Sequence, residues 1–154
     1  MEINELLAPR SVIAQLRVAG KKQALQEIAR RAAVQTGMPE RRIYDVLSDR
    51  ERLGSTGIGM GAAVPHGKLP RLERLYGVFA RLERPIAFEA IDEQPVDLIF
   101  LLLAPENAGA DHLKALALVS RLFRDRLICH KLRGTDRAEA LYALLNDRAT
   151  SNAA

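Results

Sequence analysis

The feature that most constrains this chain of 154 residues is an apolar run, Val96–Leu103, which is broken only by Asp97. The run has the length of one strand and lacks the polar alternation of a strand with one wet face. Strands of this kind usually lie in the middle of a sheet that is covered on both faces. The rest of the chain must therefore supply neighbouring strands and enough amphipathic helix to cover the sheet.

Two amphipathic helices are indicated before this run, over Lys21–Gln35 and from Pro39 to about Leu53. Apolar side chains recur along one face of each helix at the spacing of a helical turn. Gly37 and Gly54 end the two helices. The residues expected to point inward are Leu25, Ile28, Ala29 and Ala32 in the first helix and Ile43, Val46 and Leu47 in the second.

Three helices are predicted after the run, over Asp111–Phe123, Asp125–Leu132 and Asp136–Leu145. The tail after Asn146 is small and polar and is expected to fray, so the ordered core is expected to span about residues 5–146. The residues expected to point inward from the first of these helices are Leu113, Leu116, Val119 and Phe123.

Four further short strands are predicted, over Ser11–Leu16, Ala62–Val64, Leu75–Leu82 and Pro85–Phe88. No repeat, low-complexity tract or long linker divides the sequence. Because strands and helices interleave along the chain, the predicted fold is one α/β domain over residues 1–154. Its centre is a mixed β-sheet flanked by helices.

Three features of the sequence indicate the cellular compartment of the protein. The N-terminus has no basic region followed by an apolar stretch, so no signal peptide is predicted. The longest apolar run, Val96–Ala104, is far shorter than the roughly 20 residues of a membrane span. The single cysteine excludes an internal disulfide and fits a reducing compartment. These features predict a cytoplasmic protein without membrane insertion.

The charge pattern disfavours nucleic-acid binding. The formal net charge is +4, but the basic residues come as scattered pairs with acids close by. The sequence has no block of five or six like charges and no interleaving of aromatic with basic residues.

The segment Ser55–Lys68 contains the first candidate for chemistry. Three glycines alternate near its start, and His66 lies between Pro65 and Gly67. Proline fixes its own backbone and favours an extended residue before it, and glycine lets the backbone turn away without a Cβ clash. The pattern predicts an imidazole presented at a rigid strand end. A neutral imidazole, abundant near pH 7, attacks an electrophile or binds a metal.

Other kinds of site lack the residues that they need. His112, His130 and Cys129 form no His-x-x-x-His or Cys-x-x-Cys pair, so no metal and no cofactor are expected. No Gly-x-Ser-x-Gly serine is present, and the glycines lack the Gly-Lys-Ser/Thr of a P-loop. The candidates for cradling a phosphate through hydroxyl or backbone N–H groups are Ser55, Thr56, Gly57 and Gly59.

Two further residues have both a structural and a functional interpretation. Arg50 continues the apolar stripe of the second helix and precedes the glycine segment. It is either a structural salt-bridge partner or an anion clamp, because its planar guanidinium suits phosphoryl oxygens. His112, near the start of a helix, is either structural or a donor to an anion. Glu51 is interpreted as a surface or structural residue.

Taken in order, these residues resemble the IIA component of phosphoenolpyruvate-dependent phosphotransferase systems, in the fructose/mannitol-type (EIIA type-2) fold family. The resemblance covers nearly the whole chain. Gly54–Gly59 and Gln94–Asp97 are most similar to the nitrogen-regulatory branch of that family, from whose pattern Met60 and Lys114 depart. The matching segments are Arg50–Glu51, Gly54–Gly59, Val64–Gly67, Pro85–Phe88, Ile91–Leu98 and Asp111–Leu113.

The resemblance implies a phosphotransferase component with a mainly regulatory role. His66 would accept a phosphoryl group from an HPr-like phosphocarrier of the nitrogen branch. Arg50 and His112 match the positions that neutralise the phosphoryl oxygens. The phosphorylation state would control downstream regulatory proteins, and family members act on potassium transport and on sensor kinases.

Two other functions stay open at this point. One is a sugar-specific IIA that passes its phosphoryl group to a IIB domain for fructose or mannitol uptake. The other is a protein-interaction module without phosphotransfer, which the presence of both Arg50 and His66 disfavours.

Overall fold

The computed structural model describes the backbone of residues 1–153 and the side chains of residues 1–147. Its centre is a sheet in the order β1-β5-β6-β3-β2, in which β4 also pairs with β6. Parallel and antiparallel pairs both occur, so the mixed sheet that the sequence predicts is confirmed. The strands are β1 (Val12–Leu16), β2 (Gly57–Gly59), β3 (Ala62–Ala63), β4 (His66–Leu69), β5 (Tyr76–Ile86) and β6 (Val96–Pro105).

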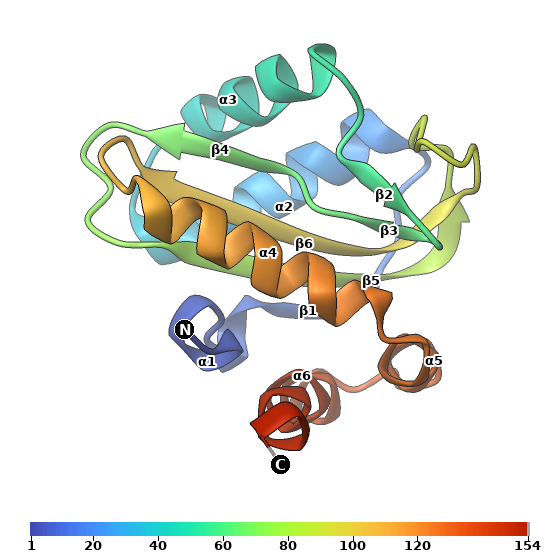
Figure 1. Cartoon of the computed structure of the whole chain (residues 1–154). Helices are drawn as coiled ribbons and strands as arrows, with labels where there is room; N and C mark the ends of the chain where they lie inside the picture. Colours follow the sequence, from blue (N-terminus) through green and yellow to red (C-terminus); the bar gives the residue numbers. More distant parts are fainter. Residues whose placement is uncertain (154) are drawn as a thin grey trace.

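Helices cover both faces of this sheet (Figure 1). Helices α2 and α3 pack on one face, and α1, α4, α5 and α6 pack on the other. The helices are α1 (Ile3–Leu6), α2 (Lys21–Thr36), α3 (Glu40–Arg52), α4 (Ala110–Arg124), α5 (Arg126–Arg133) and α6 (Ala138–Ala153), with a 3-10 turn at Pro9–Ser11.

The apolar run forms β6, in the middle of the sheet as predicted. Ile99 and Leu101 pack against the α2–α3 layer, whereas Leu98 and Phe100 pack against the opposite layer. Because side chains alternate across a strand, a strand buried on both faces needs an apolar residue at nearly every position. Asp97 is the exception, and its carboxylate pairs with Arg133 of α5.

Strands β3 and β4 are two parts of one interrupted strand beside β6. Both pair with β6 in parallel, and between them the N–H of Leu102 donates to the carbonyl of Pro65. The β2 hairpin covers the outer edge of β3 only. Beyond it, α3 packs against β4. The functional side chains described below lie where the hairpin gives way to this helix.

The predicted elements do not include α1, β2 or β4, and two further details of the predicted secondary structure are wrong. The segments expected as separate strands over 75–82 and 85–88 form the single strand β5, because its ladder with β6 absorbs extra residues between Arg81 and Ile86 as a bulge. In α4 the buried stripe contains His112, Ala115, Val119, Leu122 and Phe123, and Leu113 is 69% exposed. The helix is thus rotated by about one residue from the expected stripe, which turns His112 inward.

The predicted limits of the ordered core are compared with the structure at each end of the chain in turn. Ile3 and Leu6 of α1 are buried against the α4–α6 layer, so the packed core begins slightly before residue 5. The backbone of α6 continues to Ala153. The side chains from residue 148 onward lie outside the described residues, and the fraying expected after Asn146 stays a prediction.

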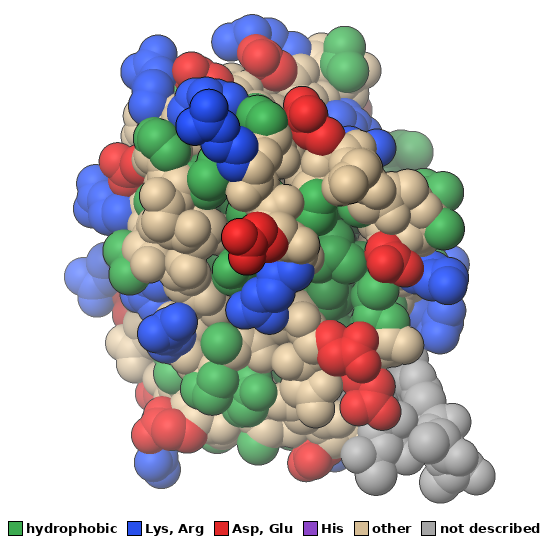
Figure 2. All heavy atoms as spheres, turned by 90° about the vertical axis from the view of Figure 1, so that its left-hand side faces the viewer, with side chains coloured by type: hydrophobic (Ala, Val, Ile, Leu, Met, Phe, Trp, Pro, Cys, Tyr) green, Lys and Arg blue, Asp and Glu red, His purple; other side chains and the backbone are tan. Residues whose placement is uncertain are grey.

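Surface charges are mixed. On the face seen in Figure 2, basic and acidic side chains alternate with apolar ones and no continuous basic stripe is present. Several basic side chains pair with acids one helical turn away, as in Arg41–Asp45 and Arg52–Asp49. Within the described part of the chain, no helix combines the length and apolar character needed to cross a bilayer.

Candidate functional site

The site is built around His66, the first residue of β4. Its Nδ1 lies 2.8 Å from the carbonyl oxygen of Val64. The carbonyl can only accept, so Nδ1 carries the proton and the neutral imidazole presents an unprotonated Nε2. This bond fixes the tautomer and the orientation of the ring.

The register of β4 decides which way these residues face. His66 is paired with Leu102, whose side chain packs with the α4 layer, and Gly67 is paired with Leu103, which packs with α2 and α3. Paired residues of neighbouring strands point to the same face of a sheet. The imidazole therefore points toward the α4 layer, and position 67 points toward α3.

Gly67 has a different role from the one expected. It continues the strand instead of turning the backbone. A Cβ at this position would overlap Cγ1 of Val46 on α3. The absence of a side chain at position 67 therefore lets α3 approach the strand that carries the histidine.

His112 meets His66 from α4. The two ring centroids are 5.7 Å apart and the rings are inclined at 67°, an edge-to-face arrangement. His112 is only 7% exposed, and its Nε2 has no hydrogen-bond partner among the described residues. Burial lowers the pKa of His112, and the charges of His66 and Lys68 lower it further. Sequence reasoning placed this residue beside an inward stripe, whereas the structure makes it part of that stripe.

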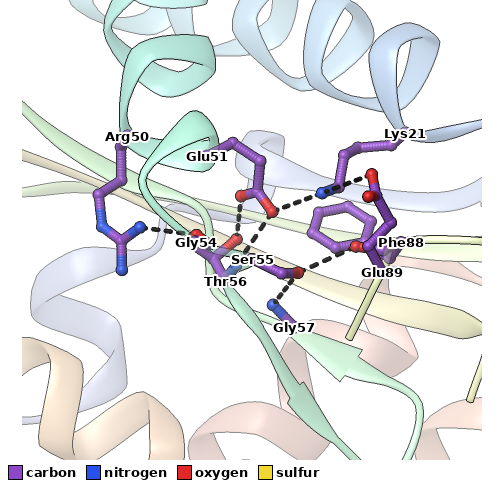
Figure 3. A network of polar contacts seen from close by, with 9 residues as sticks. All are labelled: Lys21, Arg50, Glu51, Gly54, Ser55, Thr56, Gly57, Phe88 and Glu89. Carbon is purple, nitrogen blue, oxygen red and sulfur yellow. Dashed lines mark hydrogen bonds and ion pairs between the residues drawn. The ribbon is translucent and has the colours of Figure 1, made fainter. Parts of the chain in front are cut away.

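Arg50 approaches from the last turn of α3. Its Nη1 donates a 2.8 Å hydrogen bond to the carbonyl of Gly54, which holds the guanidinium at the end of the helix (Figure 3). Burial lowers the pKa of His66, and the positive charge of Arg50 lowers it further. The bond to Val64 and the charge of Glu51 act in the opposite direction. The net effect keeps His66 neutral, which is the form with a free lone pair.

The buried position of Glu51 was the hardest feature of the site to predict from the sequence. Its side chain is only 6% exposed. One carboxylate oxygen accepts from Oγ1 of Thr56 at 2.6 Å, and the other accepts from the N–H of Thr56 at 3.0 Å and pairs with Nζ of Lys21 at 2.8 Å. Burial alone would raise the pKa of Glu51, but the bonds from Lys21 and Thr56 outweigh it and lower the pKa. The only sequence signal for this carboxylate was its position beside Arg50.

The candidate phosphate-binding groups of the glycine segment already have partners. Ser55 donates through Oγ to the carbonyl of Phe88 and accepts from the N–H of Gly57. Both donors of Thr56 are bonded to Glu51. Figure 3 shows these contacts joining the loop to Glu51 of α3 and to Phe88.

Gly59 lies away from the imidazole. It is paired with Ala62, four residues before His66, so the rise of a strand separates them by on the order of 10 Å. The adjacent Met60 donates through its N–H to Asp92. The structure thus brings Arg50, His66 and His112 together, places Ser55 and Thr56 in the supporting loop, and separates Gly59 from them.

This arrangement suits transfer of an anionic group to nitrogen. A fixed, neutral imidazole supplies the nucleophile, a guanidinium supplies positive charge, and a second imidazole supplies a nitrogen that has no hydrogen-bond partner among residues 1–147. Within the described residues, no group of three or more His, Cys, Asp and Glu side chains is arranged to hold a metal ion.

Residues 5–148 match the family described as "Phosphoenolpyruvate-dependent sugar phosphotransferase system, EIIA 2". The chain therefore belongs to this family of phosphotransfer components, as the sequence predicted. Within the family, its relatives include nitrogen regulatory proteins. That of Bradyrhizobium diazoefficiens is 58% identical over 94% of this chain and 95% of its own length. That of Escherichia coli is 41% identical over 96% of this chain and 91% of its own length.

Solved structures agree with this placement. The nitrogen regulatory protein IIA-Ntr of Neisseria meningitidis superposes with a TM-score of 0.88 at 34% identity, over 93% of this chain and 98% of that one. The mannitol IIA of Escherichia coli, at 21% identity and a TM-score of 0.75, shares the fold. The predicted fold class and the resemblance to the nitrogen-regulatory branch are both confirmed. A fructose-specific EIIA component from Haloferax volcanii is 30% identical, so the sugar-specific alternative is the weaker one.

Proposed function

We propose that this chain is a regulatory phosphocarrier in which Nε2 of His66 accepts a phosphoryl group. The observation that carries the proposal is the 2.8 Å contact of Nδ1 with the Val64 carbonyl. It leaves Nε2 as the nitrogen with a lone pair. The donor is a phosphohistidine on an HPr-like carrier of the nitrogen branch.

In the transfer, Nε2 of His66 forms a bond to phosphorus while the bond between phosphorus and the carrier's imidazole breaks. The electron pair of the broken bond returns to the carrier's imidazole, which carries a proton on its other ring nitrogen and therefore leaves as the neutral base. The proton on Nδ1 stays in place, and its bond to Val64 strengthens as positive charge develops on the ring. Such a reaction asks the protein for alignment and charge stabilisation and for little covalent chemistry.

Arg50 and His112 are assigned to the phosphoryl oxygens. The guanidinium provides positive charge, and the Nε2 of His112, without a partner among the described residues, provides a donor in its Nε2–H tautomer. Ser55, Thr56, Gly57 and Gly59 are assigned to the scaffold. The first three already have hydrogen-bond partners, in the loop, on α3 and at Phe88, and Gly59 lies at the far end of the loop.

Two exposed leucines support carrier docking beside the histidine. Leu53, which precedes Gly54, is 84% exposed, and Leu113, which follows His112, is 69% exposed. Exposed apolar side chains next in sequence to the segments that carry Arg50 and His112 favour a transient protein partner over a deep small-molecule pocket. Phosphorylation then adds negative charge at His66, which changes the set of downstream regulatory proteins that dock.

The test is phosphorylation in a reconstituted system. The chain is incubated with phosphoenolpyruvate, its phosphotransfer enzymes and either the nitrogen-branch or the sugar-branch phosphocarrier, and mass spectrometry locates the phosphate. We expect faster labelling by the nitrogen-branch carrier, on His66, and none in His66→Ala. Labelling of His66→Ala equal to that of the parent refutes the assignment of the acceptor. Faster labelling by the sugar-branch carrier, followed by transfer to a IIB domain, makes the sugar-specific alternative the correct one.

A further inference from the structure

Lys21 lies outside the group of residues that the proposed chemistry uses, yet it joins three segments around the site. It comes from the first turn of α2, far from His66 in the sequence. Its Nζ lies 2.8 Å from Glu51 and 3.6 Å from Glu89, and 4.7 Å above the ring of Phe88. Only 18% of its side chain is exposed. A lysine held this closely has lost most of its rotamer freedom, which only compensating contacts offset.

The contacts of Lys21 lead in two steps to Arg50. Glu51, held by Lys21, binds both donors of Thr56 and so fixes the start of β2 to the end of α3. The segment that it fixes begins at Gly54, whose carbonyl accepts from the Arg50 guanidinium. Figure 3 shows the continuous path from α2 through the loop to Arg50.

The ion pair between Lys21 and Glu51 also affects the electrostatics around His66. Glu51 is close enough to His66 for its charge to act on the imidazole. A buried carboxylate without a partner would repel a phosphoryl group arriving at Nε2. Because the Nζ of Lys21 lies only 2.8 Å from that carboxylate, its positive charge offsets most of the field that the carboxylate exerts on an arriving phosphoryl group.

From this arrangement we infer that Lys21 and Glu51 form a positioning pair for phosphoryl transfer. They lock the Gly54–Thr56 segment so that its carbonyl aims Arg50 at the acceptor, and Lys21 cancels the charge of the carboxylate. The inference rests on the proposed function of His66.

The experiment compares Lys21→Met with Lys22→Met, which changes the next lysine of the same helix. Transfer from the phosphorylated nitrogen-branch carrier is followed over a range of carrier concentrations. We expect Lys21→Met to slow transfer at saturating carrier by about 10- to 100-fold, the usual effect of losing a charged hydrogen bond, with little change in the half-saturating concentration. Lys21→Arg should retain most of the rate, and Lys22→Met all of it. Equal rates for Lys21→Met and Lys22→Met would overturn the inference.

A double variant separates positioning from charge. In Lys21→Met/Glu51→Leu position 51 carries no charge and has no acceptor for Thr56, so the repulsion is removed but the loop is still released. We expect transfer to stay slow. Recovery of the parental rate would show that only the charge of Glu51 matters and would overturn the positioning role.

A third measurement is independent of phosphotransfer. Titration of the unphosphorylated protein by NMR should show a higher pKa of His66 in Lys21→Met than in the parent, because Arg50 is released and Glu51 loses its partner. An unchanged pKa would contradict the inference. If Lys21→Met does not fold, Thr56→Val, which keeps the N–H bond and loses the hydroxyl bond, serves in its place. Failure of the parent chain itself to be labelled on His66 would instead count against the proposed function.

Discussion

The close approach of α3 to β4 at Gly67 gives the sharpest test of how the fold builds the site. A Cβ at position 67 would overlap Cγ1 of Val46. Ordinary contact between carbon atoms is about 3.5–4.0 Å, so the helix and the strand must separate by on the order of 1 Å in Gly67→Ala. Val46 and Arg50 are one helical turn apart on α3, so the movement that relieves the overlap also displaces Arg50 from His66.

Two opposing effects set the size of the stability change. Forcing an extra methyl group into a packed contact costs about 1–3 kcal/mol, whereas alanine gains about 0.5–1 kcal/mol over glycine within a strand. The overlap dominates, and a net loss of about 1–2 kcal/mol is expected. For a domain of this length each kcal/mol shifts the melting temperature by about 2–4 °C, so the expected fall in Tm is about 2–8 °C.

In Gly67→Ala, phosphoryl transfer to His66 should be impaired more strongly than folding. A misplacement on the order of 1 Å between reacting groups and the charges that stabilise them lowers a transfer rate by up to about 100-fold. Phosphoryl transfer to His66 is therefore measured well below the melting temperature of Gly67→Ala, where the variant is folded. The matched control is Gly67→Ala/Val46→Ala, in which the methyl group that would be overlapped is gone.

The double variant decides between a steric and a conformational explanation. If the overlap with Val46 is the cause, Gly67→Ala/Val46→Ala recovers most of the transfer rate and is more stable than the sum of the two single changes predicts. A single variant that is as stable and as fast as the parent refutes the reasoning. So does a double variant that remains as slow as Gly67→Ala.

Stability at acid pH tests the burial of the two imidazoles. Burial holds the pKa of His66 and of His112 below 6.5, so the unfolded chain takes up protons first as the pH falls. The free energy of unfolding is therefore unaffected well above pH 6.5 and decreases as the pH drops below it. Thermal unfolding of His66→Asn/His112→Asn between pH 7.5 and 5 should show a smaller loss than the parent, and an equal loss would contradict the burial argument. Arg133→Met removes the ion pair with Asp97 and the bond from Nη2 to the Met60 carbonyl. Urea unfolding should show a free energy of unfolding lower by about 1–3 kcal/mol. Because this contact lies at the far end of the β2–β3 hairpin, a large change in the transfer rate would contradict the separation of this contact from the site around His66. Cys129 is buried, its Sγ donates to the Phe123 carbonyl, and burial raises the pKa of its thiol. A thiol reagent should therefore label the native protein far more slowly than the protein in denaturant. Fast labelling of the native protein would show that α5 opens readily.

Much of the fold could be predicted because its patterns are local. The β6 run, the helices α2 and α3 and the position of His66 after proline depend on neighbouring residues in the chain. The stripe of α4 was misplaced because Leu113 is apolar and His112 is polar, and hydropathy alone put the leucine inside. What turns the histidine inward is its contact with His66, a residue 46 positions earlier, and such contacts leave no local pattern.

The supporting network was harder to predict than the residues proposed for the chemistry. Ser55 and Thr56 are hydroxyl residues beside glycines, a composition that fits a phosphate loop as well as it fits a loop bonded to the protein around it. Only the partners tell the two apart: Ser55 bonds to Phe88 and Thr56 to Glu51, which in turn pairs with Lys21 from a third segment. Glu51 in particular has the sequence context of an exposed residue at the end of a helix.

The electrostatics of the site have opposite consequences before and after the proposed phosphorylation. Burial, followed by the charge of Arg50, disfavours a second proton on His66. Both effects keep the lone pair of Nε2 available. Once that nitrogen carries a phosphoryl group, the side chain of residue 66 becomes negatively charged, and the guanidinium that opposes a second proton there attracts the phosphoryl oxygens. Groups that disfavour protonation of His66 therefore favour its phosphorylation, so the site discriminates between a proton and a phosphoryl group through charges that the fold has already fixed.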